Sequence, residues 1–192
     1  MKFLIGSLIL ALTTGAFANE HKSDAGEDMA KMITLTAVSE NHAILKDLVG
    51  RWKTSSKFWM DKNSKPEEAS GTQVNKLIMD GRFLQSEAKG TAMGKPFTGM
   101  GLLGYDNIKS EYQSMWIDNM NTSLMTSSGS FDGASKTLNE KGTGSCPMTG
   151  EKNRVFRGEW RFVDKKNYVY SLYSNGKDGA EYKMMEITYK KN

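Results

Sequence analysis

Residues 97–118 read FTGMGLLGYDNIKSEYQSMWID, which predicts two strands joined by a tight turn at Asp106-Asn107. One face at period two carries glycine, aromatic and small polar residues through both strands: Phe97, Gly99, Gly101, Leu103, Tyr105, Tyr112, Ser114, Trp116 and Asp118. Glycine weakens a strand, so its repetition here indicates either sharp curvature or the close approach of backbone or of a ligand. A curled sheet with aromatic side chains along it predicts a barrel with an interior.

The same alternation begins at Arg51 and continues to the end of the chain, interrupted by turn residues such as Asp80-Gly81 and Asp132-Gly133. Strands are expected at 51–60, 70–79, 82–90, 97–105, 110–118, 122–131, 135–143, 154–163, 166–174 and 181–190. Hairpin-linked strands in this number form an up-and-down sheet, which removes its edges by closing. The sequence therefore predicts an all-β fold, a closed antiparallel barrel of about ten strands.

A short helix is expected before the first strand. Ser39 is a suitable N-cap, and Gly50 is a suitable C-terminal glycine. Apolar residues follow at helical spacing between them: Ala43, Ile44, Leu45, Leu48 and Val49. This helix is predicted to cover one end of the barrel.

The first residues have the pattern of a secretory signal. Lys2 precedes an apolar run and the sequence Ala16-Phe17-Ala18, so residues 1–18 are expected to be cleaved and the protein to be exported, to the periplasm or outside the cell. The run is too short for an ordinary membrane-spanning helix, and no stable membrane insertion is expected. Residues 19–38 are predicted to be a flexible leader with one short helical turn, and residues 39–192 a single domain.

Composition excludes several classes of protein. The net charge of +4 is mild and both signs are interspersed, so no nucleic-acid partner is expected. Cys146 is the single cysteine, so no internal disulfide can form, and we interpret it as a spare thiol in a loop. The 13 methionines suit either ordinary core packing or an adaptable ligand surface. Nothing in the sequence determines the oligomeric state.

An ordered set of residues resembles a known family. Its segments are His42-x-x-Leu45-x-x-Leu48-Val49-Gly50-x-Trp52, Gly81-Arg82-Phe83-Leu84, Gly101-x-x-Gly104-Tyr105-Asp106, Trp116-Ile117-Asp118-x-Met120-x-Thr122 and Asp178-Gly179-x-Glu181-x-Lys183-Met184-Met185-Glu186-Ile187-x-Tyr189. Together they resemble the domain of unknown function DUF1579 over residues 40–191. Because no activity is established for that family, the resemblance implies no catalytic residues.

The DUF1579 family is similar to the calycin group of small β-barrels, which includes lipocalins and fatty-acid-binding proteins. A helix followed by Gly50-x-Trp52 resembles the lipocalin opening, in which the tryptophan packs at the closed end of the barrel. By this analogy Lys190 or Lys191 would lie over Trp52 as a cation–π partner. The resemblance implies a ligand-holding fold, although fold analogy alone does not establish function.

No cofactor or metal site is predicted. The two histidines, His21 and His42, lie in the leader and on the expected helix, so no strand offers an axial haem ligand. One cysteine and two histidines do not make a closed zinc site, and no loop is dense enough in carboxylates for calcium. The same shortage of histidine excludes a Ser-His-Asp triad, and no catalytic residue is predicted.

Polar groups among apolar strand residues, together with aromatic side chains, form the candidate ligand pocket. It consists of Trp52, Arg82, Tyr105, Tyr112, Trp116, Asp118, Arg157 and Glu186. The alternative for each charged residue is a place on the solvated outer face. The expected function is non-catalytic binding of a small amphipathic ligand. A solid barrel that acts through a protein partner, and an enzyme on a lipid-like or ring substrate, remain open.

Overall fold

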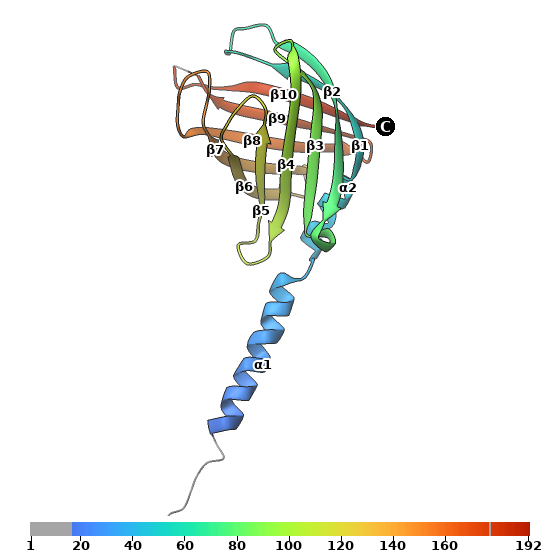
Figure 1. Ribbon diagram of the computed structural model, residues 1–192, viewed down its shortest axis with the longest axis vertical. Helices are drawn as coiled ribbons and strands as arrows, with labels where there is room; N and C mark the ends of the chain where they lie inside the picture. Colours follow the sequence, from blue (N-terminus) through green and yellow to red (C-terminus); the bar gives the residue numbers. More distant parts are fainter. Residues whose placement is uncertain (1–16, 177) are drawn as a thin grey trace, which may run out of the picture. The chain divides into compact units, whose positions relative to one another are not determined.

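The computed structural model describes residues 17–176 and 178–192 (Figure 1). Each strand pairs antiparallel with the next along the chain, and β1 pairs with β10 to close the barrel. The strands are β1 (Gly50–Phe58), β2 (Glu67–Ile78), β3 (Phe83–Ala92), β4 (Lys95–Asp106), β5 (Glu111–Asp118), β6 (Met125–Asp132), β7 (Thr137–Gly144), β8 (Arg154–Asp164), β9 (Asn167–Asn175) and β10 (Glu181–Lys191). The predicted closed antiparallel barrel is confirmed, with ten strands at the expected places.

The predicted covering helix is also confirmed, as two short helical segments. The 3₁₀-helix η1 (Glu40–His42) leads directly into α2 (Ala43–Asp47). The backbone N–H of Ser39 donates to Nδ1 of His42 at 3.1 Å, which fixes the entry to η1. Leu45 and Leu48 are 0% and 1% exposed, because this segment packs its apolar side onto the barrel core.

Trp52 joins the helix to the closing strand pair. Its indole Nε1 donates to the Leu48 carbonyl oxygen at 2.9 Å, and its ring meets Tyr168 edge-to-face at 4.7 Å. The Lys191 Nζ lies 5.1 Å from the Trp52 ring centroid, which confirms the predicted cation–π contact. Gly50 has φ of +138°, and a Cβ there would come within 2.8 Å of the Lys191 side chain. A glycine is therefore needed where the helix turns into β1.

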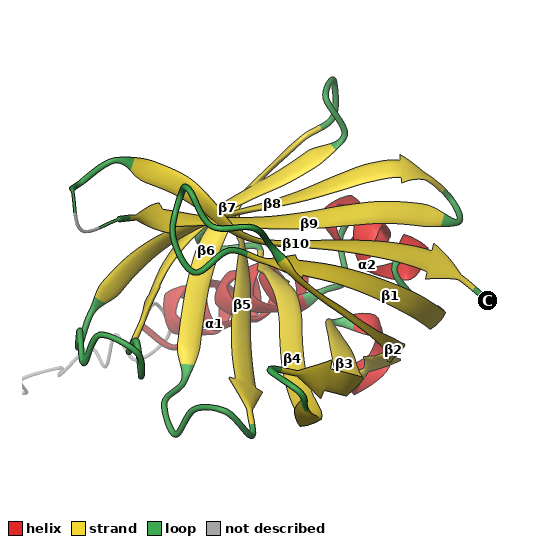
Figure 2. Ribbon diagram, turned by 90° about the horizontal axis from the view of Figure 1, so that it is seen from above, coloured by secondary structure: helices red, strands yellow, loops and turns green. Residues whose placement is uncertain are grey.

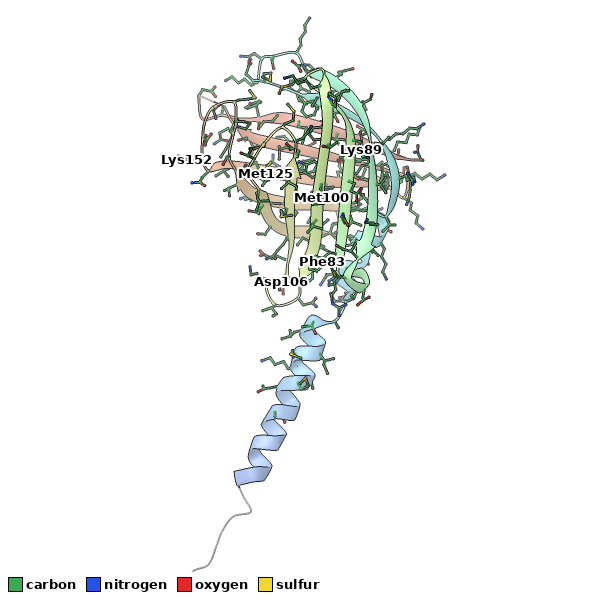
Figure 3. The ribbon with its side chains drawn as sticks, in the orientation of Figure 1. Phe83, Lys89, Met100, Asp106, Met125 and Lys152 are labelled. Atoms are coloured by element: carbon green, nitrogen blue, oxygen red, sulfur yellow. The ribbon has the colours of Figure 1, made fainter. Side chains whose placement is uncertain are left out.

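Figure 2 shows the strands of the barrel wall from above, and their pairing assigns the inner and outer faces of that wall. Two residues directly opposite each other on paired strands lie on the same face of the sheet. Buried Trp52 is opposite Gln73 on β2, and Leu77, four residues further along the same face of β2, is opposite Leu84 on β3. Leu84 is in turn opposite Leu103 on β4, so all of these residues are on the inner face. The glycine-rich face of the 97–118 hairpin therefore points inward. Lys89 and Met100 have the opposite parity and lie on the outer face (Figure 3).

The inward glycines of β4 make room for a large side chain on β5. Gly99 and Gly101 flank the Trp116 indole, and a Cβ on Gly99 would lie 2.3 Å from Trp116 Cζ2. On Gly101 a Cβ would lie 3.0 Å from Trp116 Cε3. These two glycines therefore admit the Trp116 ring close to the backbone, an approach of a side chain that the sequence did not predict.

The chain divides into two units, residues 1–37 and 38–192, and the first contains helix α1 (Phe17–Thr36). A leader with one short helical turn is predicted here, so the predicted helical extent is wrong. Half of these residues are good helix formers, namely alanine, glutamate, lysine, methionine and leucine. Residues 1–16 of the predicted signal peptide lie outside the described residues, and cleavage after Ala18 stays a prediction. Within the described part of the chain, no helix is long and apolar enough to cross a membrane.

Replacing Gly99 by alanine tests the packing of the hairpin. We expect Gly99→Ala to lower the free energy of unfolding by about 1–3 kcal/mol, because the added methyl group displaces the Trp116 ring. Urea unfolding followed by circular dichroism measures the change. Gly133→Ala is the matched control, since no atom lies within 4 Å of its Cβ position, and it should change stability by less than about 0.5 kcal/mol. Equal effects of the two substitutions would contradict this packing.

Candidate functional site

The inner face of the barrel has an apolar floor beneath helix α2. Buried side chains from the helix and from most strands pack together there: Leu45, Leu48, Trp52, Leu84, Leu103, Tyr112, Leu138, Tyr168 and Tyr189. Tyr168 and Tyr189 stack with ring centroids 4.1 Å apart. Burial raises the pKa of Tyr112 to about 12, and its phenol donates to the Asn41 carbonyl oxygen at 2.6 Å. The floor side chains therefore pack against one another at this end of the barrel.

A polar layer follows directly above the floor. Glu140 lies two residues beyond Leu138 on the inner face of β7 and is 5% exposed. Its carboxylate accepts from Ser127 Oγ at 2.8 Å, from the Tyr170 phenol at 3.1 Å and from Ser114 Oγ at 3.3 Å. The Ser114 and Ser127 oxygens are 2.6 Å apart. We call these four residues the Glu140 cluster.

Two glycines leave space for the Glu140 side chain. Glu140 is directly opposite Gly129 on β6 and Gly158 on β8. A Cβ on Gly158 would lie 2.5 Å from Glu140 Oε1, and one on Gly129 would lie 2.7 Å from Glu140 Cα. The carboxylate therefore occupies an inward position that its neighbours on both sides leave free.

The charge of the Glu140 cluster is not neutralised by a cationic side chain. Among the described residues, the ion pairs within 4.0 Å all involve other carboxylates. Burial, and then the charge of Glu140, raise the pKa of Tyr170 well above its ordinary value. The Tyr170 phenol thus keeps its proton at neutral pH and remains a donor to the carboxylate.

An apolar wall continues from the Glu140 cluster toward the end of the barrel away from α2. Its inward side chains are Trp116, Met125, Phe156, Leu172 and Met185. Trp116 is half-buried, and its Nε1 donates to Asp118 Oδ2 at 2.9 Å. The loops at this end include Lys152, far from the Asp106 turn (Figure 3). They also carry exposed methionines: Met60, Met93, Met120 and Met148.

The structure separates the predicted pocket residues into groups. Trp52, Tyr105 and Tyr112 belong to the floor, where Tyr105 and Tyr112 meet edge-to-face at 4.8 Å. Trp116 and Asp118 lie together on the inner wall, nearer the opposite end.

Arg82 follows η2 (Met79–Gly81) at the α2 end of the barrel and forms a 3.8 Å ion pair with Asp80. Its side chain is 41% exposed. Burial, and in addition the charge of Arg82, lower the pKa of His42, whose ring meets Tyr105 of the floor at 5.9 Å. Arg82 therefore lies beside the floor.

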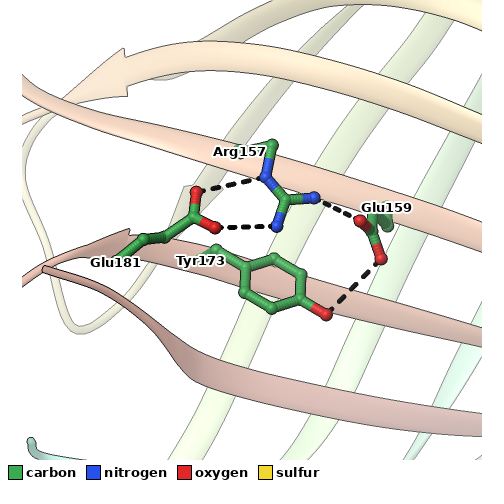
Figure 4. A network of polar contacts seen from close by, with 4 residues as sticks. All are labelled: Arg157, Glu159, Tyr173 and Glu181. Atoms are coloured by element: carbon green, nitrogen blue, oxygen red, sulfur yellow. Dashed lines mark hydrogen bonds and ion pairs between the residues drawn. The ribbon is translucent and has the colours of Figure 1, made fainter. Parts of the chain in front are cut away.

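Arg157 and Glu186 lie on the outer face. Arg157 donates to both oxygens of Glu181, at 3.1 and 2.9 Å, and pairs with Glu159, which accepts from the Tyr173 phenol (Figure 4). The hydrogen bonds to Glu181 raise the pKa of Arg157 above its ordinary value.

Glu186 pairs with Lys183, away from the interior. A β-bulge between Lys183 and Met185 changes the parity of β10, so the inward positions move from Tyr182 to Met185 and Ile187. Simple alternation from Tyr182 would have placed Glu186 inside.

Two surface pockets of about 370 Å³ each lie outside the Glu140 cluster. The first is beneath α2 and includes Ile44, Phe131 and Phe162 in its lining. The second lies beside the β7–β8 loop and includes Arg154 and Tyr173. For metals, the described residues bring together no group of three or more His, Cys, Asp or Glu side chains.

Cys146 lies in the predicted loop and contacts Arg154, whose Nη1 donates to its Sγ at 3.2 Å. Burial opposes ionisation of the thiol, but hydrogen bonds from Thr149, Arg154 and the backbone outweigh it and lower the pKa of Cys146 to about 7. A substantial fraction of the thiol is therefore ionised at neutral pH.

The Glu140 cluster was not among the predicted site residues. Its signal in the sequence is the alternation of Leu138, Glu140 and Gly142, which places a carboxylate in line with an apolar residue. Only one strongly apolar residue marks that face of β7, so the sequence does not show which side is buried.

The alkylation rate of Cys146 tests its electrostatic environment. With iodoacetamide, we expect the rate to rise with pH to half its maximum near pH 7, the pKa of the thiol. Arg154→Gln removes a hydrogen bond that favours the thiolate, so the midpoint should move to higher pH. Mass spectrometry follows the reaction, and Lys152→Gln is the control for a nearby loss of charge. Equal midpoints in Arg154→Gln and the unaltered protein would contradict the role of Arg154.

Comparisons with known proteins identify the family. The family model described as "Protein of unknown function (DUF1579)" matches residues 37–191. No curated protein matches the chain. Rv2717c from M. tuberculosis has a similar crystal structure, with a TM-score of 0.60, 14% identity and coverage of 81% of this chain and 99% of that one.

Two redesigned β-barrels are more distant. For b11L5F_LGL the TM-score is 0.38, with 12% identity over 77% of this chain and 94% of that one. For mFAP1, whose structure was solved bound to DFHBI, the TM-score is 0.40, with 16% identity over 77% of this chain and 97% of that one. Of these three structures, Rv2717c alone has a TM-score above 0.5, and at 14% identity its likeness concerns the fold alone. Because the family model spans residues 37–191, the chain belongs to the DUF1579 family of unknown function.

Proposed function

We propose that the barrel binds a small amphipathic ligand on its inner face. The polar group of the ligand would contact the Glu140 cluster, and its apolar part would lie along Trp116, Met125 and Met185. The observation that supports this most strongly is the order of the layers, in which a buried carboxylate lies between an apolar floor and an apolar wall.

The energetics of burial favour a polar contact at this place. A carboxylate removed from water is costly unless its lone pairs are satisfied, and it has about four acceptor sites. Three hydroxyl groups lie within 3.3 Å of the Glu140 carboxylate, but Ser114 and Ser127 share one hydrogen bond at 2.6 Å, so two hydroxyl protons are left to donate to Glu140. A further donor from a ligand would complete this shell, in the manner of pockets that orient an apolar ligand by a few polar groups.

The end of the barrel away from α2 is suited to ligand entry. Its loops carry Met60, Met93, Met120 and Met148 on the surface, where flexible thioethers adapt to apolar molecules of different shape. The Trp116 ring is half-buried on the inner wall below these loops. We further propose that the protein works after export, as its first 18 residues predict.

A protein that acts through its outer face is the second candidate. The Arg157–Glu159–Glu181 network with Tyr173 forms an ordered charged surface across β8, β9 and β10 (Figure 4). These charges already satisfy one another, so a partner would have to replace existing pairs. For this reason ligand binding inside the barrel is the preferred function.

An uncharged probe tests the proposal without assuming a charge on the ligand. We expect 11-bromoundecanol to bind saturably and to quench tryptophan fluorescence, because bromine would lie against Trp116. Ala88→Phe fills the inner wall beside Gly99 and should weaken binding by about tenfold or more.

The matched control for that substitution is Lys89→Phe, which adds the same ring to the outer face of the same strand and should leave binding unchanged. Melting temperatures of both variants establish that they fold. Absence of saturable binding, or equal effects of the two substitutions, would contradict binding inside the barrel.

A further inference from the structure

We infer that the barrel selects ligands whose polar group is a cation, such as a protonated alkyl amine, held at the carboxylate of Glu140. This inference rests on the proposed function and specifies its ligand class. It follows from the charges that line the inner face and from the partners that each of them already has.

The inward carboxylates lack cationic partners. Glu140 is contacted by the hydroxyl groups of its cluster, and Asp118 accepts from the Trp116 indole and from the Met120 backbone N–H at 2.9 Å. Neither Glu140 nor Asp118 has a Lys, Arg or His nitrogen within 4.0 Å among the described residues. An anionic head group placed here would meet like charge in a poorly solvated setting.

Two cations on this face, Arg154 and Lys191, are engaged elsewhere, and a third, Lys95, lies opposite Ala92 and is exposed at the rim of the barrel. Arg154, near the β7–β8 loop, donates to Ser174 Oγ at 2.9 Å, to the Asn175 carbonyl oxygen at 3.1 Å and to Cys146. Lys191 lies over the Trp52 ring at the floor. The inner wall between these two positions thus has a surplus of negative charge.

The surroundings of Glu140 are also suited to an ammonium group. The Tyr170 phenol keeps its proton and donates a hydrogen bond to Oε1 of Glu140 at 3.1 Å. The Tyr170 and Trp160 rings, with centroids 4.6 Å apart, lie on the same inner face, and aromatic faces attract cations. Each hydroxyl of the cluster also has a free acceptor lone pair for an N–H donor.

Three ligands that differ only in their head group test the inference. We would measure the affinities of 11-bromoundecylamine, 11-bromoundecanol and 11-bromoundecanoate at pH 7 by calorimetry. The amine should bind at least about tenfold more tightly than the alcohol, because its contact with Glu140 is a charge-assisted hydrogen bond. The carboxylate should bind most weakly.

Glu140→Gln tests the origin of the preference. It should reduce amine affinity by about tenfold while leaving alcohol affinity nearly unchanged, because it keeps the shape of the side chain and removes its charge. Glu87→Gln, the same change on the outer face of β3, should leave the order of the three ligands unaltered.

The possible outcomes distinguish failure of ligand binding inside the barrel from failure of the preference for a cation. If none of the three ligands binds, the proposed function itself is wrong. If all bind but the carboxylate is preferred, or Glu140→Gln leaves the preference for the amine intact, ligand binding stands and the cation inference is overturned. Melting curves of Glu140→Gln show whether a loss of binding is caused by unfolding. If it is, the relative affinities of the unaltered protein for the amine, the alcohol and the carboxylate decide whether the cation inference holds.

Discussion

The contact of Trp52 with the helix and with the closing strands is the interaction on which the rest of the fold depends. Its indole donates to the Leu48 carbonyl oxygen, its ring packs against Tyr168, and Lys191 lies over it. Because β1 pairs with β10, the same residue is located where the barrel closes and where its end is covered. Once this floor is fixed, the strand registers determine which side chains form the layer above it.

Pairing of large and small residues determines what the interior can contain. Trp116 lies over Gly99 and Gly101, Phe156 lies against Gly142, and Glu140 extends beside Gly158. Each of these inward side chains is accommodated because the neighbouring strand lacks a Cβ at that position. The result is a wall that holds aromatic rings and one buried carboxylate close to the backbone, which is compatible with a ligand lying along the barrel axis.

Local alternation was sufficient to predict the strands, but it could not assign their faces. The hairpin of residues 97–118 was expected to have one distinct face, and strand pairing places that face inside. Glu186 was predicted for the pocket, yet the β-bulge in β10 turns it outward. Glu140 was missed because Leu138 is the one strongly apolar residue on its face of β7, so alternation alone did not show which face of that strand is buried. Helix α1 was underestimated, because its residues favour a helix without an apolar pattern strong enough to indicate its length.

The central claim is that a ligand enters the barrel with its polar group at Glu140 and its tail along the inner wall. A crystal structure with 11-bromoundecylamine tests this most directly, because the anomalous signal of bromine locates the end of the tail. We predict that the amine nitrogen lies within hydrogen-bonding distance of the Glu140 carboxylate, that the tail passes Trp116 and Met185, and that the bromine peak lies beyond them inside the barrel, toward the end away from α2. A bromine peak found only on the outer surface, or only in the pocket beneath α2 beside Phe131 and Phe162, would contradict it.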